Sequence, residues 1–319
     1  MARPALPALA AIVLALGGVS GGEPAGGHPA RVSPPIDAAR VSQRSDAARV
    51  PVVLIVLENH DYTQIVGNRD LAPYINCAGQ FAGTGLICNG KLYTNYAGLF
   101  HPSLPNYLAI TSGSNQGCTD DDCPPDSITS SNVFNELARA GRTWRAFEES
   151  MRIACELADD PNGVYVVHHN PPPYFTDLVS TGGCAASDLP YSKLVISNLP
   201  DFSFVTPNLC DDMHDASVDC FQYAPGCSDI ICVGDRWLGR NVPPLVRAGV
   251  DVVVAFDEPR LSSPATGKVM TVQIGPAVPK GSTDGHAYNH YSLLRGIEDF
   301  FGLSCLQSAC GASALPINR

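Results

Sequence analysis

Long apolar runs that end in polar residues dominate the hydrophobic pattern. One run, PVVLIVLEN, begins at Pro51, and another, VDVVVAFDEP, begins at Val250. Runs of this kind predict strands of a parallel sheet that is covered on both faces. Two further segments are strand-like: DFSFVTPN, which begins at Asp201, and KVMTVQIGPAV, which begins at Lys268.

Helical patterns alternate with these strands. NVFNELARAG carries its apolar residues on one face, with Asn132 as the expected cap and Gly141 at its end, and the strand-like TWRAF follows. Near the C-terminus, we expect Ser292 to cap an amphipathic helix that Gly302 ends. Strands alternating with helices predict an α/β fold with a mostly parallel central sheet flanked by helices.

The first 49 residues lack this pattern. A basic residue and then an apolar run over residues 5–16 precede small residues, which predicts a secretory signal peptide over residues 1–24. The run is too short to remain as a membrane anchor, and no other stretch is long and apolar enough to span a bilayer. Residues 25–49, rich in Gly, Pro, Ala and Ser, predict a flexible lead-in. We therefore expect a secreted protein whose folded domain covers residues 50–319.

Charge narrows the set of partners. The chain has 20 Lys and Arg residues against 31 Asp and Glu residues, and its basic residues form no stripe. A net charge of −11 repels a nucleic-acid backbone, so we expect no nucleic-acid partner. A phosphate site in such a chain would need local positive charge from a metal, a histidine or a helix N-terminus.

Twelve cysteines form an even set, and none lies in the predicted signal peptide. An exported protein normally oxidises such a set, which here allows six disulfides. A zinc site is the alternative, but it usually requires closer C-x2-C pairs with histidine nearby. Three pairs share the spacing C-x4-C: Cys118 and Cys123, Cys227 and Cys232, and Cys305 and Cys310.

Polar residues follow two of the predicted buried strands. Glu58 and Asn59 end the first, and Asp257 and Glu258 end the one that begins at Val250. Ligands of parallel sheets bind beyond the carboxyl ends of the strands, so these side chains are expected at the ligand crevice. Carboxylate and amide oxygens suit a divalent cation, although a polar turn that ends each strand is the simpler alternative.

Ser103 lies in the segment HPSLPNYLAITSGS. Pro105 is well placed as the first residue of a helix, which would put Ser103 just before the helix N-terminus. A phosphoryl group on this serine would meet free backbone N–H groups and the positive end of the helix dipole. A role as a simple helix cap is the alternative.

Two further segments concentrate ionisable residues. PNLCDDMHD, from Pro207 to Asp215, packs three aspartates and one histidine directly after a predicted strand. Such a group is costly to bury without a cation or an anionic ligand, while a solvated acidic loop is the alternative. GHAYNHYS, which contains His286 and His290, precedes the last predicted helix.

Taken in order along the chain, these motifs resemble one family. They are similar to those of the bacterial phosphoesterase family, which contains secreted acid phosphatases and, more distantly, phospholipase C enzymes, within the alkaline-phosphatase-like superfamily. The motifs are nearest to those of the secreted mycobacterial-type acid phosphatases. The matching motifs of this chain are LEN at 57–59, HPSLPNY at 101–107, YVVHHNP at 165–171, TPNLCDDMHD at 206–215, FDEP at 256–259 and NHYS at 289–292.

The resemblance implies roles for single residues. Ser103 matches the family nucleophile, and the positions matching the metal ligands are Glu58, Asn59, Asp257 and Glu258. The histidines matching those of the phosphate pocket are His101, His169, His214 and His290, and Asn106 and Asp212 are expected to bind substrate. The resemblance also favours the disulfides Cys210–Cys220 and Cys123–Cys155. Many relatives read W-D-E-x-D where this chain has Phe256 before the acid pair and Pro259-Arg260 after it.

The function expected from the resemblance is that of a secreted, metal-dependent phosphomonoesterase, an acid phosphatase that works through a phosphoserine. A divalent metal cation of unspecified identity would be its cofactor, and a small-molecule or lipid-headgroup phosphate ester its substrate. A phosphodiesterase or phospholipase C using the same site is the nearest alternative. A secreted metal-binding domain without catalytic activity is the other alternative.

Overall fold

The computed structural model describes residues 50–161, 163–214, 219–222 and 224–318. All of the described residues belong to one compact unit, Ala48–Arg319. The predicted signal peptide and lead-in lie outside the described residues. No helix in the described part of the chain is long and apolar enough to cross a membrane.

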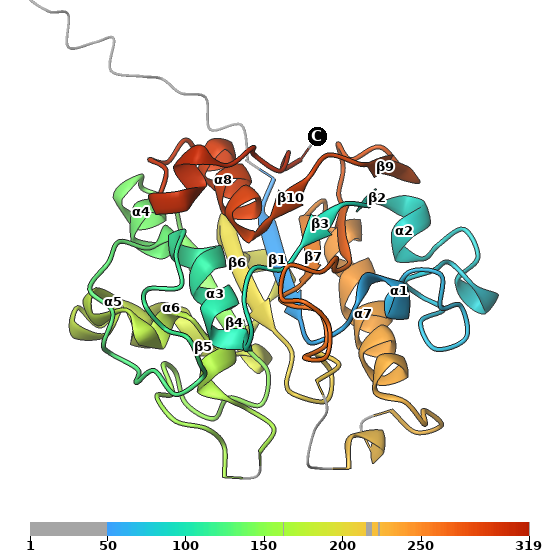
Figure 1. Cartoon of the computed structure of the whole chain (residues 1–319), viewed down its shortest axis with the longest axis horizontal. Helices are drawn as coiled ribbons and strands as arrows, with labels where there is room; N and C mark the ends of the chain where they lie inside the picture. The colour runs from blue at the N-terminus through green and yellow to red at the C-terminus, as the bar shows by residue number, and fades with distance from the viewer. Residues whose placement is uncertain (1–49, 162, 215–218, 223, 319) are drawn as a thin grey trace, which may run out of the picture. The chain divides into compact units, whose positions relative to one another are not determined.

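An eight-stranded sheet forms the centre of this unit (Figure 1). Its strand order is β5-β4-β6-β1-β7-β8-β2-β9, and all neighbouring pairs are parallel except the two that involve β8. The predicted mostly parallel α/β fold is therefore confirmed. The strands are β1 (Val52–Leu57), β2 (Lys91–Tyr93), β4 (Trp144–Glu148), β5 (Asp188–Pro190), β6 (Phe202–Thr206), β7 (Asp251–Phe256), β8 (Thr271–Ile274) and β9 (Ser282–Asp284), with β3 (Tyr96–Ala97) and β10 (Tyr288–Asn289) in a separate pair.

The two longest apolar runs form the adjacent central strands β1 and β7. Every residue of both strands is buried, as expected for strands that are covered on both faces. The strands pair in parallel from Val52 opposite Asp251 to Leu57 opposite Phe256. Glu58 and Asp257 therefore leave the sheet side by side at its carboxyl edge.

Helices cover both faces of the sheet (Figure 1). One face carries α3 (Ser103–Ser112), α4 (Val133–Arg139) and α8 (His290–Phe301), which pack on one another. The other carries α7 (Ile230–Arg247), with α1 (Tyr62–Ile65) and α2 (Leu86–Asn89) beside it. The remaining helices are short: α5 (Thr176–Ser180), α6 (Gly183–Ser187) and the 3-10 turns η2 (Gly79–Phe81), η3 (Val167–His169), η4 (Pro172–Tyr174), η5 (Tyr191–Lys193), η6 (Ile196–Asn198), η7 (Cys220–Gln222) and η8 (Gln307–Gly311).

The predicted helix ends are correct in one case and partly wrong in the other. Asn132 caps α4, since its side chain accepts a hydrogen bond from the N–H of Asn135. Ser292 does not cap α8, because the side chain of Asn289 accepts from the N–H groups of Tyr291 and Ser292, so the cap lies three residues earlier than predicted. Gly302 ends α8 in the left-handed conformation, as predicted.

All twelve cysteines are paired in six disulfides, including the three C-x4-C pairs. Of the two bonds implied by the resemblance, Cys210–Cys220 is confirmed. Cys123–Cys155 is wrong, because Cys123 lies beside Cys118 and Cys155 beside Cys184, with Cα separations of 5.9 and 5.3 Å that suit disulfides. The sixth bond joins Cys77 to Cys88.

The Cys155–Cys184 bond should contribute the most to stability. It closes a sequence separation of 29 residues, against 5 for Cys118–Cys123. Because a longer closed loop removes more conformational freedom from the unfolded chain, its loss should cost about 3–4 kcal/mol, against about 2 kcal/mol for the shorter loop. Urea unfolding of the two paired-serine variants checks this order. Equal losses would contradict it.

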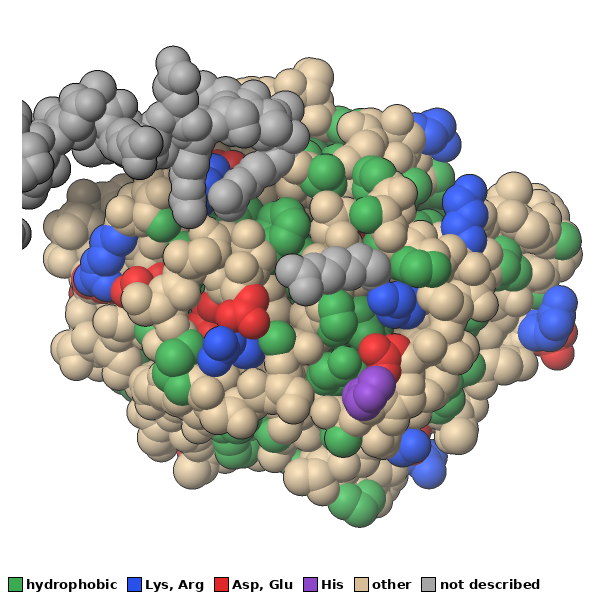
Figure 2. All heavy atoms as spheres, turned by 90° about the horizontal axis from the view of Figure 1, so that it is seen from above, with side chains coloured by type: hydrophobic (Ala, Val, Ile, Leu, Met, Phe, Trp, Pro, Cys, Tyr) green, Lys and Arg blue, Asp and Glu red, His purple; other side chains and the backbone are tan. Residues whose placement is uncertain are grey.

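Surface charge is distributed in small groups. On the face in Figure 2, Lys and Arg side chains stand apart from one another, several of them beside acidic side chains. On the described part of that face they form no continuous basic stripe. The negative net charge of the chain is therefore not offset by a positive patch there.

Candidate active site

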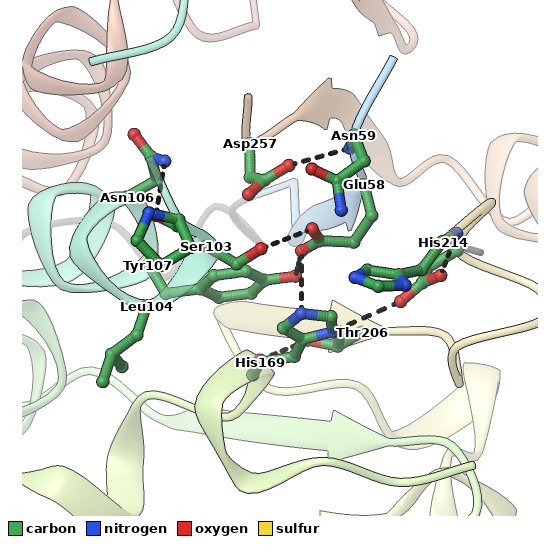
Figure 3. Close-up of polar contacts among 12 residues, drawn as sticks. Glu58, Asn59, Ser103, Leu104, Asn106, Tyr107, His169, Thr206, His214 and Asp257 are labelled. Atoms are coloured by element: carbon green, nitrogen blue, oxygen red, sulfur yellow. Dashed lines mark hydrogen bonds and ion pairs between the residues drawn. The ribbon is translucent and has the colours of Figure 1, made fainter. Parts of the chain in front are cut away.

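Ser103 is the first residue of α3 and is 3% exposed. Its hydroxyl donates a hydrogen bond to Glu58 Oε2 at 2.8 Å (Figure 3). The helix begins two residues before Pro105, which occupies the first turn, where a missing N–H has no cost. The expectation of free N–H groups there needs correction, since the N–H of Leu104 already donates to Asp121 Oδ1 at 2.8 Å.

Glu58 lies at the centre of the site and is fully buried. While Oε2 accepts from Ser103, Oε1 accepts from the hydroxyl of Tyr107 at 2.6 Å. Tyr107 follows Ser103 by four residues, so both hydroxyls lie on one face of α3. The sequence prediction missed Tyr107, although this spacing within HPSLPNY could have identified it.

Asn59 and Asp257 face each other across the ends of β1 and β7 (Figure 3). The N–H of Asn59, which adopts a φ of 59°, donates to Asp257 Oδ1 at 3.3 Å. The side-chain oxygen of Asn59, Oδ1, and the second carboxylate oxygen of Asp257, Oδ2, are buried and have no hydrogen-bond partner in the described structure. Buried oxygens without a partner are costly unless a ligand satisfies them.

Two of the predicted histidines lie beside Glu58. The Nε2 atom of His169 is 3.5 Å from Glu58 Oε1, and its Nδ1 atom is 3.3 Å from Asp212 Oδ2. Asp212 also accepts from the N–H of His214 at 2.7 Å. One potential ligand atom each from Glu58, His169 and His214 lie within 4.8 Å of one another. The acidic segment after β6 therefore reaches the same centre as Ser103.

His101, Glu258 and Asn106 form a neighbouring cluster. His101 Nδ1 lies 2.7 Å from Glu258 Oε2, and its Nε2 donates to the carbonyl of Ser263 at 3.0 Å. Asn106 accepts from two backbone N–H groups through Oδ1 and donates through Nδ2 to two carbonyls and to Glu258 Oε2. No polar atom of Asn106 is left for a substrate, which differs from its expected role.

His290 also lies differently from the expectation. It is fully buried at the start of α8, with Nδ1 2.9 Å from the hydroxyl of Tyr96. Its Nε2 bonds to the backbone carbonyl of Asp257. His290 therefore contacts the strand end that carries Asp257, and both of its ring nitrogens have protein partners. His286 is exposed and pairs with Asp284.

The site concentrates buried acids: Glu58, Asp212, Asp257 and Glu258. Burial raises the pKa of Asp257 to about 7, and burial together with the charge of Asp257 raises that of Glu258 to about 10. The same two causes raise the pKa of Glu58. Burial lowers the pKa of His169, and the neighbouring His168 and His214 lower it further. A bound cation would offset both the burial and the repulsion of these carboxylates.

The donor set fits a hard divalent cation. Glu58, Asn59, Asp257 and Ser103 offer oxygen atoms that converge in Figure 3. Two of these oxygens have no protein partner, as described above. Carboxylate, amide and hydroxyl oxygens are the ligands that such cations prefer.

Comparison with known proteins identifies the family. The sequence model of the Phosphoesterase family matches residues 78–224. The phosphatidylinositol-3-phosphatase of Mycobacterium tuberculosis is 31% identical over 256 residues, which cover 79% of this chain and 77% of that protein. The phosphate-repressible acid phosphatase of Penicillium chrysogenum is 29% identical over 281 residues, covering 82% of this chain but only 62% of the fungal protein.

A solved structure agrees in fold. A protein of the alkaline phosphatase superfamily from Vibrio parahaemolyticus superposes with a TM-score of 0.52 at 10% identity, over 82% of this chain and 70% of that one. At this identity the likeness concerns the fold alone. The sequence matches carry the assignment further: the chain belongs to the phosphoesterase family, which makes it a hydrolase of phosphate ester bonds.

Proposed function

We propose that this chain is a secreted, metal-dependent phosphomonoesterase that acts through a phosphoserine on Ser103, with residues 50–319 as its phosphoesterase domain. The observation that carries the proposal is the hydrogen bond of 2.8 Å between Ser103 Oγ and Glu58 Oε2. This serine faces the partnerless oxygens of Asn59 and Asp257. A nucleophile beside an acceptor and a cluster of cation ligands is the arrangement that phosphoryl transfer requires.

Glu58, Asn59, Asp257 and Ser103 would hold the cation. Glu258 would complete the set, with its Oε2 oriented by His101 and Asn106. When bound, the cation supplies Lewis-acid stabilisation of the phosphoryl oxygens and favours ionisation of the serine hydroxyl. We therefore assign His101 and Asn106 to positioning, because their polar atoms contact Glu258 and backbone groups.

Ser103 carries out the first step. Its Oγ attacks phosphorus, the Oγ–P bond forms and the bond from phosphorus to the leaving oxygen breaks. Glu58 Oε2 is placed to take the hydroxyl proton, since it already accepts that hydrogen bond. Water then attacks the phosphoserine and gives a proton to His214, which has lost one to the leaving oxygen. The Oγ–P bond breaks, and Ser103 Oγ takes back the proton held by Glu58 Oε2.

Two histidines serve the phosphoryl group and the leaving group. His169 has a lowered pKa, so we assign it to donating a neutral ring N–H to a phosphoryl oxygen. His214, which is only partly buried, protonates the leaving oxygen. Asp212 bonds to the backbone of His214 and lies beside the ring of His169, so it orients both.

The relatives support a monoester substrate. The mycobacterial relative is a phosphatidylinositol-3-phosphatase, and the fungal relative is an acid phosphatase. On this basis we propose a small-molecule or lipid-headgroup phosphate monoester as the substrate. Six disulfides are consistent with the proposed secretion.

A substrate panel tests the proposal. p-Nitrophenyl phosphate should be hydrolysed faster than bis-p-nitrophenyl phosphate at about pH 5–7, the range in which histidines titrate. A monoester presents more negative charge and more free oxygens to a cation and histidines than a diester does. Initial rates for the two esters at matched concentrations measure this preference. A faster diester would replace the phosphatase with a phosphodiesterase of the phospholipase C type.

A further inference from the structure

A pocket of about 350 Å³ opens beside the reaction centre. Asn59 belongs both to this pocket and to the group of oxygens around Ser103. Three of its lining side chains are apolar, and among the described residues that line it only Arg260 carries a fixed charge. The residues used below are Asn59, Met213, Ile230, Arg260 and Leu261.

Arg260 lines this pocket and has a partly free guanidinium group. Its Nε lies 2.9 Å from Asp61 Oδ2, and its side chain is 57% exposed. Neither terminal amino group of Arg260 has a hydrogen-bond partner among the residues that the structure describes. The ion pair with Asp61 therefore engages the side chain at Nε and leaves its two outer amino groups available to bind a ligand.

Hydrogen bonds link the loop that carries Arg260 to the reaction centre. The N–H of Ser263 donates to the carbonyl of Arg260 at 2.8 Å, and its hydroxyl donates to Asp61 Oδ2 at 2.9 Å. The carbonyl of Ser263 accepts from His101, which in turn contacts Glu258. These bonds connect Arg260 to the acid cluster beside Ser103.

The other walls of the pocket are apolar. Met213 and Ile230 line it, and Leu261 is 69% exposed, which is unusual for a large aliphatic side chain without a partner. A pocket of this volume is at the lower end of the range for small-molecule sites. Its lining suits a compact ring or short chain that ends in an anion.

We propose that this pocket receives the alcohol part of the phosphate ester, and that Arg260 binds a second anionic group on it, a carboxylate or a phosphate. The proposal rests on the proposed function, since it makes this pocket the leaving-group side of the same centre. Guanidinium groups bind carboxylates and phosphates through paired N–H donors. The pocket is a specificity site in a chain whose net charge of −11 otherwise disfavours anions.

Paired aryl phosphates test the proposal. We compare kcat/KM for 4-carboxyphenyl phosphate and phenyl phosphate in the wild type and in Arg260→Gln. The ratio of the two values should fall about tenfold in the variant, because one charged hydrogen-bond partner is lost. Taking the ratio within each enzyme, and comparing it between enzymes, cancels the intrinsic reactivity of each leaving group. Arg260→Lys should retain part of the preference.

Arg295→Gln is the matched control. Arg295 is also fixed through Nε to an aspartate, Asp299 at 2.7 Å, but it lies on α8 and does not line the pocket. This variant loses the same charge and should keep the wild-type ratio. An unchanged ratio in Arg260→Gln, or an equal fall in Arg295→Gln, would overturn the proposal.

A binding measurement separates this proposal from the proposed function. Calorimetry with 4-carboxyphenyl phosphate compares Ser103→Ala with the double variant Ser103→Ala/Arg260→Gln. Binding about tenfold weaker in the double variant supports the subsite even if the wild type hydrolyses neither ester, a result that would overturn only the phosphatase assignment. Equal binding by the two variants would overturn the subsite whatever the enzyme hydrolyses.

Discussion

Replacing Ser103 with alanine should reduce hydrolysis of p-nitrophenyl phosphate at least about a thousandfold, because the group that forms the covalent bond is removed. The fold should survive. Glu58 keeps its hydrogen bond from Tyr107, so the variant loses one hydrogen bond, worth about 1 kcal/mol, and a few degrees of melting temperature. Initial rates and calorimetry on the same preparation measure both effects.

Ser112→Ala provides the matched control for this prediction. Ser112 is a second buried serine on α3, and its hydroxyl donates to the carbonyl of Leu108 at 2.7 Å, far along the helix from Glu58. It should lose at least as much stability, because Gln116 also donates to this hydroxyl at 2.7 Å, and it should keep its activity. Acid quenching of the wild type should trap phosphate on the peptide that contains Ser103. Turnover by Ser103→Ala within tenfold of the wild type would refute the nucleophile assignment.

The sequence predicts the central strands well because their signal is local. β1 and β7 are continuous apolar runs, and burial on both faces requires that pattern. The short strands β2, β5 and β9 were not predicted. Each has three residues, and its pairing partner lies far away in the chain, so no periodic pattern marks it. The start of α8 depends on which of two polar residues reaches the free N–H groups, a choice that propensity alone does not decide.

The candidate site was predicted as a set of residue types but less well as a set of contacts. The motifs bring Ser103, Glu58 and His169 together. The partners of the other residues depend on tertiary structure. For example, the backbone carbonyl of Ser263 occupies one nitrogen of His101, and that of Asp257 occupies one nitrogen of His290. Backbone groups leave no mark in a sequence motif, so a histidine that supports the site resembles one that contacts substrate.

Removing the metal should abolish activity and change how stability depends on pH. In metal-free protein, burial raises the pKa of Asp257 to about 7, above its ordinary value near 4. A carboxyl whose pKa is higher in the folded than in the unfolded state contributes fully to the free energy of unfolding at low pH. This contribution is lost as pH rises from about 4 to about 7. The melting temperature of chelated protein should therefore fall between pH 5 and pH 8. Metal-loaded protein should lose less over that range, because the cation stabilises the ionised carboxylates.

Asp257→Asn tests the same site without a chelator. It removes one charged ligand and should lower both metal content, measured by elemental analysis, and turnover, the latter at least about a hundredfold. Asp251→Asn is its matched control: Asp251 is also a buried aspartate, at the other end of the same strand, where it accepts hydrogen bonds from Gln273. That variant should keep its metal and its activity, because its carboxylate lies a full strand length from Ser103. Full turnover by protein shown to be free of metal would rule out a catalytic cation. The cost of burying these mutually repelling carboxylates would then have to be offset by something other than a metal.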